Sequence, residues 1–210
     1  MSGQRASVRL FESDFLERFS FAGPILVAGV WLPLIVAAGS YGAFHAASAL
    51  AATLTAMAAL FGWTLFEYVM HRFIFHFSAT SRPGKWLLFV LHGCHHADPQ
   101  DKRRNMMTPA VTLVIGGVFL AAFIATIGPA LGAVAFAGFM TGYLAYDFTH
   151  YACHQLSWSW MKPLKRRHFA HHFGGQEANF AVTFPVWDRL FGTPLVKLEA
   201  GQRKRRSGAG

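Results

Sequence analysis

Two long stretches without charged residues dominate the pattern of apolar and polar positions along the chain. They cover residues 19–66 and 105–146, and neither contains Asp, Glu, Lys or Arg. A helix needs about 20 apolar residues to cross a membrane, so each stretch is long enough for two crossings. The pattern therefore predicts two helical hairpins, over residues 19–66 and 105–152.

Turn-forming residues divide each hairpin into two helices. The run Gly-Ser-Tyr-Gly at residues 39–42 is prone to form a turn. Gly128 and Pro129 mark the second division, since proline suits the first turn of a helix. The helices expected on this basis span residues 21–38, 43–67, 109–127 and 130–152. The expected fold class is an all-α integral membrane protein with four transmembrane helices in two hairpins.

The positions of the basic residues determine the expected orientation. All 19 Lys and Arg residues lie in residues 1–18, 71–104 or 162–206, and none lies in either predicted turn. Two hairpins place these three segments on one side of the membrane, and the positive-inside rule makes that side cytoplasmic. We therefore expect a multi-pass membrane protein with a cap on its cytoplasmic face.

The composition agrees with this arrangement. Hydrophobic residues make up 53% of the chain and charged residues 14%, which is unusual for a soluble globular protein. A net charge of +9 is often found in proteins that bind nucleic acid. However, the basic residues flank the spans, so we expect contacts with membrane lipids and no nucleic-acid partner. Cys94 and Cys153 cannot form a disulfide framework, and on a cytoplasmic face we expect free thiols.

We expect the whole sequence to form a single domain in which polar parts accompany the two hairpins. Residues 1–18 are polar and form either a short amphipathic helix on the membrane surface or a frayed terminus. The cap combines residues 71–104 with residues 153–198. Within it, aromatic and polar residues alternate over 173–198, which favours short elements packed as a lid. Residues 199–210 form a basic tail.

Ten of the eleven histidines lie in two blocks that follow the second and the fourth predicted helices. Both blocks emerge on the same side of the membrane, so they can meet at one place. His45 lies near the opposite face, where we expect an interfacial role only. The ten residues are His71, His76, His92, His95, His96, His150, His154, His168, His171 and His172.

The spacing of these histidines is typical of metal ligands, and neutral imidazole is the commonest of these. Residues three or four apart share a helix face, so a pair such as His92 and His96 can bind one ion. Adjacent histidines such as His95 and His96 point about 100° apart on a helix, so they can serve two ions. His71 and His76 are five residues apart and need irregular backbone at a helix end to meet.

Ten ligands are too many for one ion. Two ions with five imidazoles each leave one open position per ion if both are six-coordinate. Open positions on an all-nitrogen site suit a redox metal such as iron that binds dioxygen, and zinc can occupy the same ligands. Glu67 and Asp147 precede the two blocks. Either they orient ligand rings as hydrogen-bond acceptors, or they are the first charges at the membrane boundary.

Five stretches of the chain resemble one superfamily of membrane enzymes. They are EYVMHRFIFH from Glu67, LLFVLHGCHHADPQDKRR from Leu87, YDFTHYACH from Tyr146, LKRRHFAHHF from Leu164, and the region of Trp187-Asp188 and Phe191-Gly192-Thr193. The chain resembles the fatty acid hydroxylase superfamily, the sterol desaturase-like di-metal oxygenases. Within it, the chain is most similar to fatty acid 2-hydroxylases that act on sphingolipid acyl chains. The resemblance covers about residues 60–194.

The resemblance implies two metal ions, functionally iron, and divides the ten histidines between them. One ion would be bound by His71, His76, His92, His96 and His171. The other would be bound by His95, His150, His154, His168 and His172. The resemblance also implies an enzyme of the monooxygenase type, which uses dioxygen to hydroxylate the carbon next to an acyl carbonyl.

The same resemblance implies a lipid substrate from the bilayer and a separate electron donor. Eukaryotic family members often carry a fused haem-type domain, for which the 18 residues before the first span leave no room. We therefore expect a cytochrome- or ferredoxin-type donor with its reductase. Together with the Ala/Gly-rich spans, this favours a bacterial inner membrane over the endoplasmic reticulum.

Two alternatives stay open on the sequence alone. Relatives with similar histidine patterns hydroxylate or desaturate carotenoids or sterols, and the pocket between the helices decides the substrate. The alternative of another class is a membrane protein that binds or transports metal without catalysis. A transporter is expected to place its ligands near the middle of the membrane, whereas these histidines lie at its boundary.

Overall fold

The computed structural model describes residues 7–174 and 177–194, and within them every element of secondary structure is helical. The long helices are α2 (Pro24–His45), α3 (Ala49–Val69) and α6 (Pro109–Gln155). The short elements are α1 (Asp14–Arg18), η1 (Met70–Phe75), α4 (Arg82–Leu88), η2 (Phe89–Gly93), α5 (Cys94–Ala97), η3 (Ser159–Met161), α7 (Lys162–Phe173) and α8 (Val186–Leu190). The all-α prediction is confirmed for this part of the chain.

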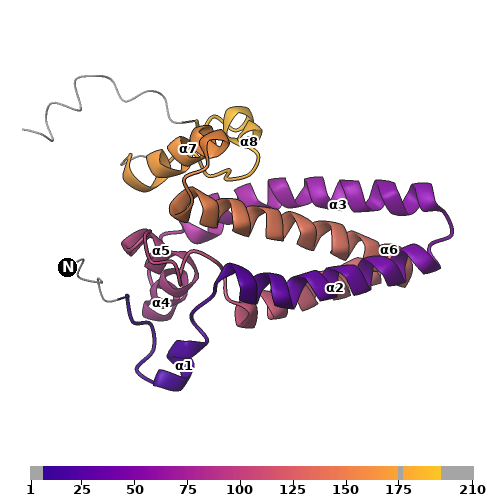
Figure 1. Ribbon diagram of the computed structural model, residues 1–210, viewed down its shortest axis with the longest axis horizontal. Coiled ribbons are helices and arrows are strands. Elements are labelled where there is room, and N and C mark those ends of the chain that lie inside the picture. Colours follow the sequence, from indigo (N-terminus) through magenta and orange to yellow (C-terminus); the bar gives the residue numbers. More distant parts are fainter. Residues whose placement is uncertain (1–6, 175–176, 195–210) are drawn as a thin grey trace, which may run out of the picture.

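Three helices are long and apolar enough to cross a membrane: α2, α3 with its continuation into η1, and α6. Helix α6 is broken at Gly128, whose backbone (φ 79°, ψ 169°) is one that other residues rarely adopt. The chain folds back there, so the rings of Phe119 and Phe123 lie 4.7 and 5.6 Å from the ring of Phe139. The two parts of α6 therefore run side by side (Figure 1), and the predicted division at Gly128 is present.

Helix α2 is longer than expected, and the predicted turn at residues 39–42 is wrong. These residues lie inside the helix, and the chain turns at residues 46–48, where the Ser48 hydroxyl caps the start of α3. Gly42 serves close packing instead, because a Cβ there would lie 2.6 Å from the Ala130 carbonyl oxygen. Small residues that let two helices approach are common in membrane helices. Composition alone does not distinguish them from turn glycines.

Helix α6 packs against both α2 and α3. A Cβ on Gly138 would collide with the Ala56 carbonyl oxygen of α3, so the two backbones touch there. Closer to the histidines, the rings of Trp63 and Phe139 lie 4.9 Å apart. These contacts hold the cap ends of α3 and α6 in a fixed relation.

The short helices gather at one end of the long helices and form the cap (Figure 1). Elements η1, α4, η2 and α5 follow α3, whereas α7 and α8 follow α6. The expected free thiols of Cys94 and Cys153 are both buried. Of the two readings of the N-terminal segment, the structure shows a short helix, α1. The predicted basic tail lies outside the described residues.

Candidate metal centre

The ten histidines of the two blocks come together in the cap as two groups of five. Within each group the five ligand atoms lie within 4.8 Å of one another. Cluster 1 consists of His71, His76, His92, His96 and His171. Cluster 2 consists of His95, His150, His154, His168 and His172. His45 belongs to neither cluster, and its ring packs against Tyr41 at the far end of α2.

Cluster 1 depends on a local widening of the helix that follows α3. Residues Met70–Phe75 form a π-helix, and the His76 N–H donates to the His71 carbonyl oxygen, five residues earlier, at 3.3 Å. An i→i+5 hydrogen bond of this kind stacks residues five apart. Both rings therefore point into the same cluster, although an α-helix would separate them.

The adjacent histidine pairs join the two clusters to each other. The Nε2 atom of His96 lies 3.2 Å from that of His171 in cluster 1. In cluster 2, Nε2 of His95 lies 3.0 Å from Nε2 of His172. The rings of His96 and His172 have their centroids 4.2 Å apart. Each cluster is thus built from both histidine blocks, and the clusters lie side by side.

The spacing of the nitrogens fits two six-coordinate ions better than two tetrahedral ones. Four Nε2–Nε2 separations connect the five rings of cluster 1, and they measure 2.8–3.2 Å. The corresponding separations in cluster 2 measure 2.6–3.0 Å. Two nitrogens bound at about 2.1 Å and at right angles are about 3.0 Å apart, whereas tetrahedral angles place them about 3.4 Å apart.

Hydrogen bonds on the outer side of the rings fix which nitrogen faces cluster 1. The Nδ1 atom of His71 lies 2.5 Å from the Phe180 carbonyl oxygen, and that of His171 lies 2.8 Å from the Ala178 carbonyl oxygen. A carbonyl oxygen only accepts, so each Nδ1 carries the hydrogen and each Nε2 presents a lone pair to the cluster. Lone pairs this close repel unless a cation lies between them. The donor set therefore fits a metal ion.

Burial keeps the imidazoles in the neutral form that binds metals. Burial, with the charge of neighbouring histidines, lowers the pKa of His171 to about 4 and that of His96 to about 3. The pKa values of His92, His95 and His168 are lowered well below their usual range for the same reasons. At neutral pH these rings need to lose no proton before an ion binds.

Glu67 holds a loop rather than a ligand ring. Its buried carboxylate accepts hydrogen bonds from the N–H groups of Val182 and Thr183, at 2.6 and 2.9 Å. The same loop supplies the Phe180 carbonyl oxygen that faces His71. Glu67 is therefore neither a direct partner of a ring nor merely the first charge at the membrane boundary. It orients the ring through the loop backbone.

Asp147, beside the second histidine block, holds a loop in the same way as Glu67 does beside the first. Its buried carboxylate accepts a hydrogen bond from the Met107 N–H at 3.3 Å and another from the Tyr143 hydroxyl at 3.0 Å. Two residues before Met107, the Asn105 carbonyl oxygen lies 2.9 Å from Nδ1 of His150. Here too, neither of the two readings from the sequence holds as stated, because the carboxylate bonds to the loop that supports the ring and not to the ring itself.

Asp188 is a buried acceptor with no role predicted from the sequence, apart from its place in one of the resembling stretches. It is 0% exposed and accepts hydrogen bonds from the N–H groups of Phe180 and Ala181, at 2.9 and 3.2 Å. The Thr193 hydroxyl and the Arg167 guanidinium each donate to it at 2.9 Å. Asp188 thus ties the loop behind cluster 1 to α7.

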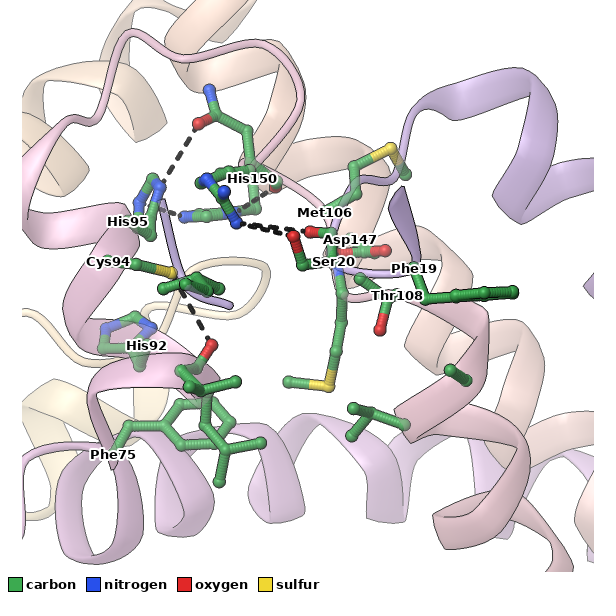
Figure 2. A pocket seen from close by; sticks show the side chains of 18 of the residues that line it. Phe19, Ser20, Phe75, His92, Cys94, His95, Met106, Thr108, Asp147 and His150 are labelled. Carbon is green, nitrogen blue, oxygen red and sulfur yellow. Dashed lines mark hydrogen bonds between the residues drawn. The ribbon is translucent and has the colours of Figure 1, made fainter. Parts of the chain in front are cut away.

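A cavity of about 200 Å³ opens beside the clusters. Figure 2 shows His92 and His95 on one side of it, with Phe19 and Thr108 on the other. Leu10, Phe11 and Leu16 of the N-terminal segment also line this cavity. The segment before α2 therefore forms part of its wall.

A second cavity of about 80 Å³ lies between α3 and α6. Its lining is almost entirely apolar and extends to Phe119 and Phe139. The two cavities are adjacent, because four residues line both of them: Phe75, Leu91, Met107 and Tyr146.

Comparisons with known proteins connect this arrangement with one family. The fatty acid hydroxylase family model matches residues 55–193. The dihydroceramide fatty acyl 2-hydroxylase FAH1 of Arabidopsis thaliana is 36% identical over 192 residues, which cover 90% of this chain and 81% of the relative. Human fatty acid 2-hydroxylase is 32% identical over 209 residues, which cover 89% of this chain and 56% of the relative.

A solved structure agrees with these sequence matches. Full-length Scs7p, of which only the hydroxylase domain is visible, superposes with a TM-score of 0.82 at 33% identity. The match covers 87% of this chain and 70% of that chain. The chain therefore belongs to the fatty acid hydroxylase family and is a hydroxylase of the monooxygenase type. The resemblance found in the sequence is confirmed.

Proposed function

We propose that this protein is a membrane-bound, dioxygen-dependent hydroxylase that acts on the carbon next to the carbonyl group of a fatty acyl chain, free or linked to a sphingolipid. The observation that carries this proposal is the pair of five-histidine clusters beside two adjacent cavities, one of which is almost entirely apolar. The identity of 36% with a dihydroceramide fatty acyl 2-hydroxylase supports the choice of substrate class and position.

Each cluster would hold one iron ion through its five Nε2 atoms, and zinc could take the same ligands. Five nitrogens leave one of six positions open, which suits a metal that must also bind dioxygen. When bound, the two ions would supply the redox chemistry that an unreactive methylene group requires. The part of the chain itself is to keep the rings neutral, to fix their orientation and to present one carbon of the lipid.

The proposed topology has four crossings, made by α2, by α3 and by the two parts of α6 on either side of Gly128. The apolar character and length of these helices support it, and the positive-inside rule favours a cytoplasmic cap. The relatives compared above come from a plant and from human. They give no support to the bacterial inner membrane expected from the sequence, so that preference is not carried forward.

The two cavities offer a path for an acyl chain. The apolar cavity between α3 and α6 suits the hydrocarbon tail. The wider cavity, which includes Ser20 and Arg104 beside the clusters, suits the polar end that carries the carbonyl group. A chain that occupied both would pass the four shared residues, next to His92, His95 and His150 of the wider cavity.

Blocking the junction of the cavities should separate substrate binding from metal binding. Met107→Trp places a large ring between the two adjacent cavities, so we expect hydroxylation to fall at least about 10-fold because the acyl chain cannot pass. Both metal ions should be retained, because Met107 contributes only its backbone N–H to the support of Asp147. Product formation and metal content are measured on the same samples.

The matched control for this variant is Met57→Trp. Met57 lies on α3, is 62% exposed and lines neither cavity, so its replacement should leave hydroxylation unchanged. Full activity of Met107→Trp would rule out the proposed path and leave the metal centre untouched.

The lipid products of cells that express the protein test the proposed function directly. Lipid mass spectrometry should find 2-hydroxy acyl chains that are absent from cells expressing the His172→Ala variant. Hydroxylated carotenoids or sterols, or new double bonds, would instead support the alternative substrates within the superfamily. Metal accumulation without any oxidised lipid would support a metal-binding or transport protein.

We also propose that electrons come from a separate cytochrome- or ferredoxin-type protein with its reductase. Reconstitution of the purified protein with each donor class, with turnover as the readout, distinguishes the two.

A further inference from the structure

Asn105 lies in the loop between α5 and α6 and is only 1% exposed. It contacts two ligands of cluster 2 through two different atoms. Its side-chain Oδ1 lies 3.3 Å from Nδ1 of His95, and its backbone carbonyl oxygen lies 2.9 Å from Nδ1 of His150. One residue therefore supports a ligand from each of the two histidine blocks.

The side-chain amide of Asn105 has one orientation that satisfies its neighbours. Its Nδ2 donates to the Pro99 carbonyl oxygen at 3.1 Å, and a carbonyl oxygen only accepts. The Oδ1 atom must then face Nδ1 of His95, from which it lies 3.3 Å. His95 therefore carries its hydrogen on Nδ1 and presents the Nε2 lone pair to its cluster.

The loop is anchored on both sides of Asn105 without help from the Asn105 side chain. The buried Arg104 guanidinium forms an ion pair with Glu17 at 2.5 Å. The Met107 N–H donates to Asp147 at 3.3 Å. The backbone carbonyl of Asn105 is thus fixed by its neighbours, whereas the hydrogen bond to His95 depends on the side chain alone.

The remaining rings of cluster 2 receive less support. Among the described residues, the buried Nδ1 atoms of His154, His168 and His172 have no hydrogen-bond partner. The two hydrogen bonds found there on the outer side of cluster 2 both end on Asn105. Cluster 2 therefore depends on this residue more than on any other neighbour in that part of the chain.

We propose that Asn105 is a positioning residue for cluster 2, and that its side chain fixes the tautomer and ring orientation of His95 and so sets the affinity of this cluster for its ion. The inference rests on the proposed binding of metal by the ten histidines. Loss of a hydrogen-bonded partner behind a ligand ring typically weakens metal affinity by about 10–100-fold.

The test uses the full chain in lipid nanodiscs, stripped of metal and titrated with Zn²⁺ alone. Asn105→Leu removes the acceptor and keeps the backbone carbonyl. We expect its second equivalent of zinc to bind about 10–100-fold more weakly than in the unchanged chain, with the first equivalent unaffected. Asn105→Asp keeps an oxygen acceptor toward His95 and should restore most of the lost affinity.

Met106→Leu provides the matched control, because Met106 is the next buried side chain of the same loop. This variant should bind both equivalents of zinc as the unchanged chain does. Equal binding of both equivalents by Asn105→Leu would overturn the inference. Equal weakening by Asn105→Leu and Asn105→Asp would also overturn it, because the bond to Pro99 would then be decisive.

Circular dichroism accompanies each titration. If Asn105→Leu loses helix content, the Asn105→Asp variant is used instead to test whether the acceptor toward His95 sets the affinity for the second equivalent. The comparison is then with an Asn105→Ser variant, because the serine side chain is too short to reach the ring. Tighter binding of the second zinc equivalent by Asn105→Asp than by Asn105→Ser would support the inference. Equal affinities in these two variants would overturn it. An unchanged chain that binds no second equivalent would instead contradict the proposed metal centre itself.

Discussion

Replacing His95 with alanine is expected to release one metal ion, and not the ion that its sequence neighbours bind. His95 belongs to the first histidine block, but its Nε2 lies 2.9 Å from Nε2 of His150 and 3.0 Å from Nε2 of His172. Loss of this ligand should empty cluster 2 while cluster 1 keeps its five rings. Metal content should fall from about two ions per chain to about one, and hydroxylation to background.

The adjacent histidine allows a control that single variants do not provide. His96→Ala should also leave about one ion, because it damages cluster 1 instead. The double variant of His95 and His96 should therefore bind no metal, whereas the double variant of His95 and His172, which share cluster 2, should still bind about one ion. A His95/His96 double variant that retained one ion would contradict the division into clusters.

Replacing Asp188 with alanine should have the largest effect on stability. The change removes an acceptor that serves two backbone N–H groups, a hydroxyl and the Arg167 guanidinium, at a position that is 0% exposed. Each buried N–H group left without an acceptor costs about 1–3 kcal/mol, and the Arg167 side chain, which is 25% exposed, also loses its partner. Cluster 1 should lose its ion first, because the loop that Asp188 holds carries the carbonyl oxygens facing His71 and His171.

Denaturant unfolding and metal content measured together check this expectation. Asp98→Ala serves as the control, since Asp98 lies in the same cap and its side chain accepts only a local hydrogen bond from the Gln100 N–H among the described contacts. Its replacement should change the free energy of unfolding by no more than about 0.5 kcal/mol. An Asp188→Ala protein as stable as this control, with both ions bound, would exclude the supporting role of Asp188.

The sequence was sufficient for the features that rest on repeating side-chain patterns. Uncharged stretches and the Gly128-Pro129 break predicted the long helices and the fold-back of α6. The two predicted hairpins placed both histidine blocks at the same end of the long helices, and the spacing within each block predicted metal ligands, since residues three or four apart share a helix face. Those features depend on the order and spacing of residues, which can be found in the sequence without the structure.

The features that were missed depend on the backbone and on long-range packing. Gly42 has the composition of a turn residue, yet its role is set by Ala130, which lies 88 positions away in the sequence. Irregular backbone at a helix end was expected to bring His71 and His76 together, but no side-chain pattern indicates that it is a π-helix. Every residue has a backbone carbonyl oxygen, so only the fold shows that those of Phe180 and Asn105 face a histidine ring.

The two adjacent histidine pairs make metal loading of the two clusters a linked process. His95 and His96 share one short segment of backbone but serve different clusters, and the same holds for His171 and His172. An ion bound in one cluster would order both segments, so a second ion would pay less conformational entropy on binding. By reciprocity, this entropic contribution would favour either ion in the presence of the other to the same extent, against the electrostatic repulsion between the two cations. In the unchanged chain this linkage would lower the population of the half-loaded state, whereas a variant that lacks one cluster would still bind a single ion in the other.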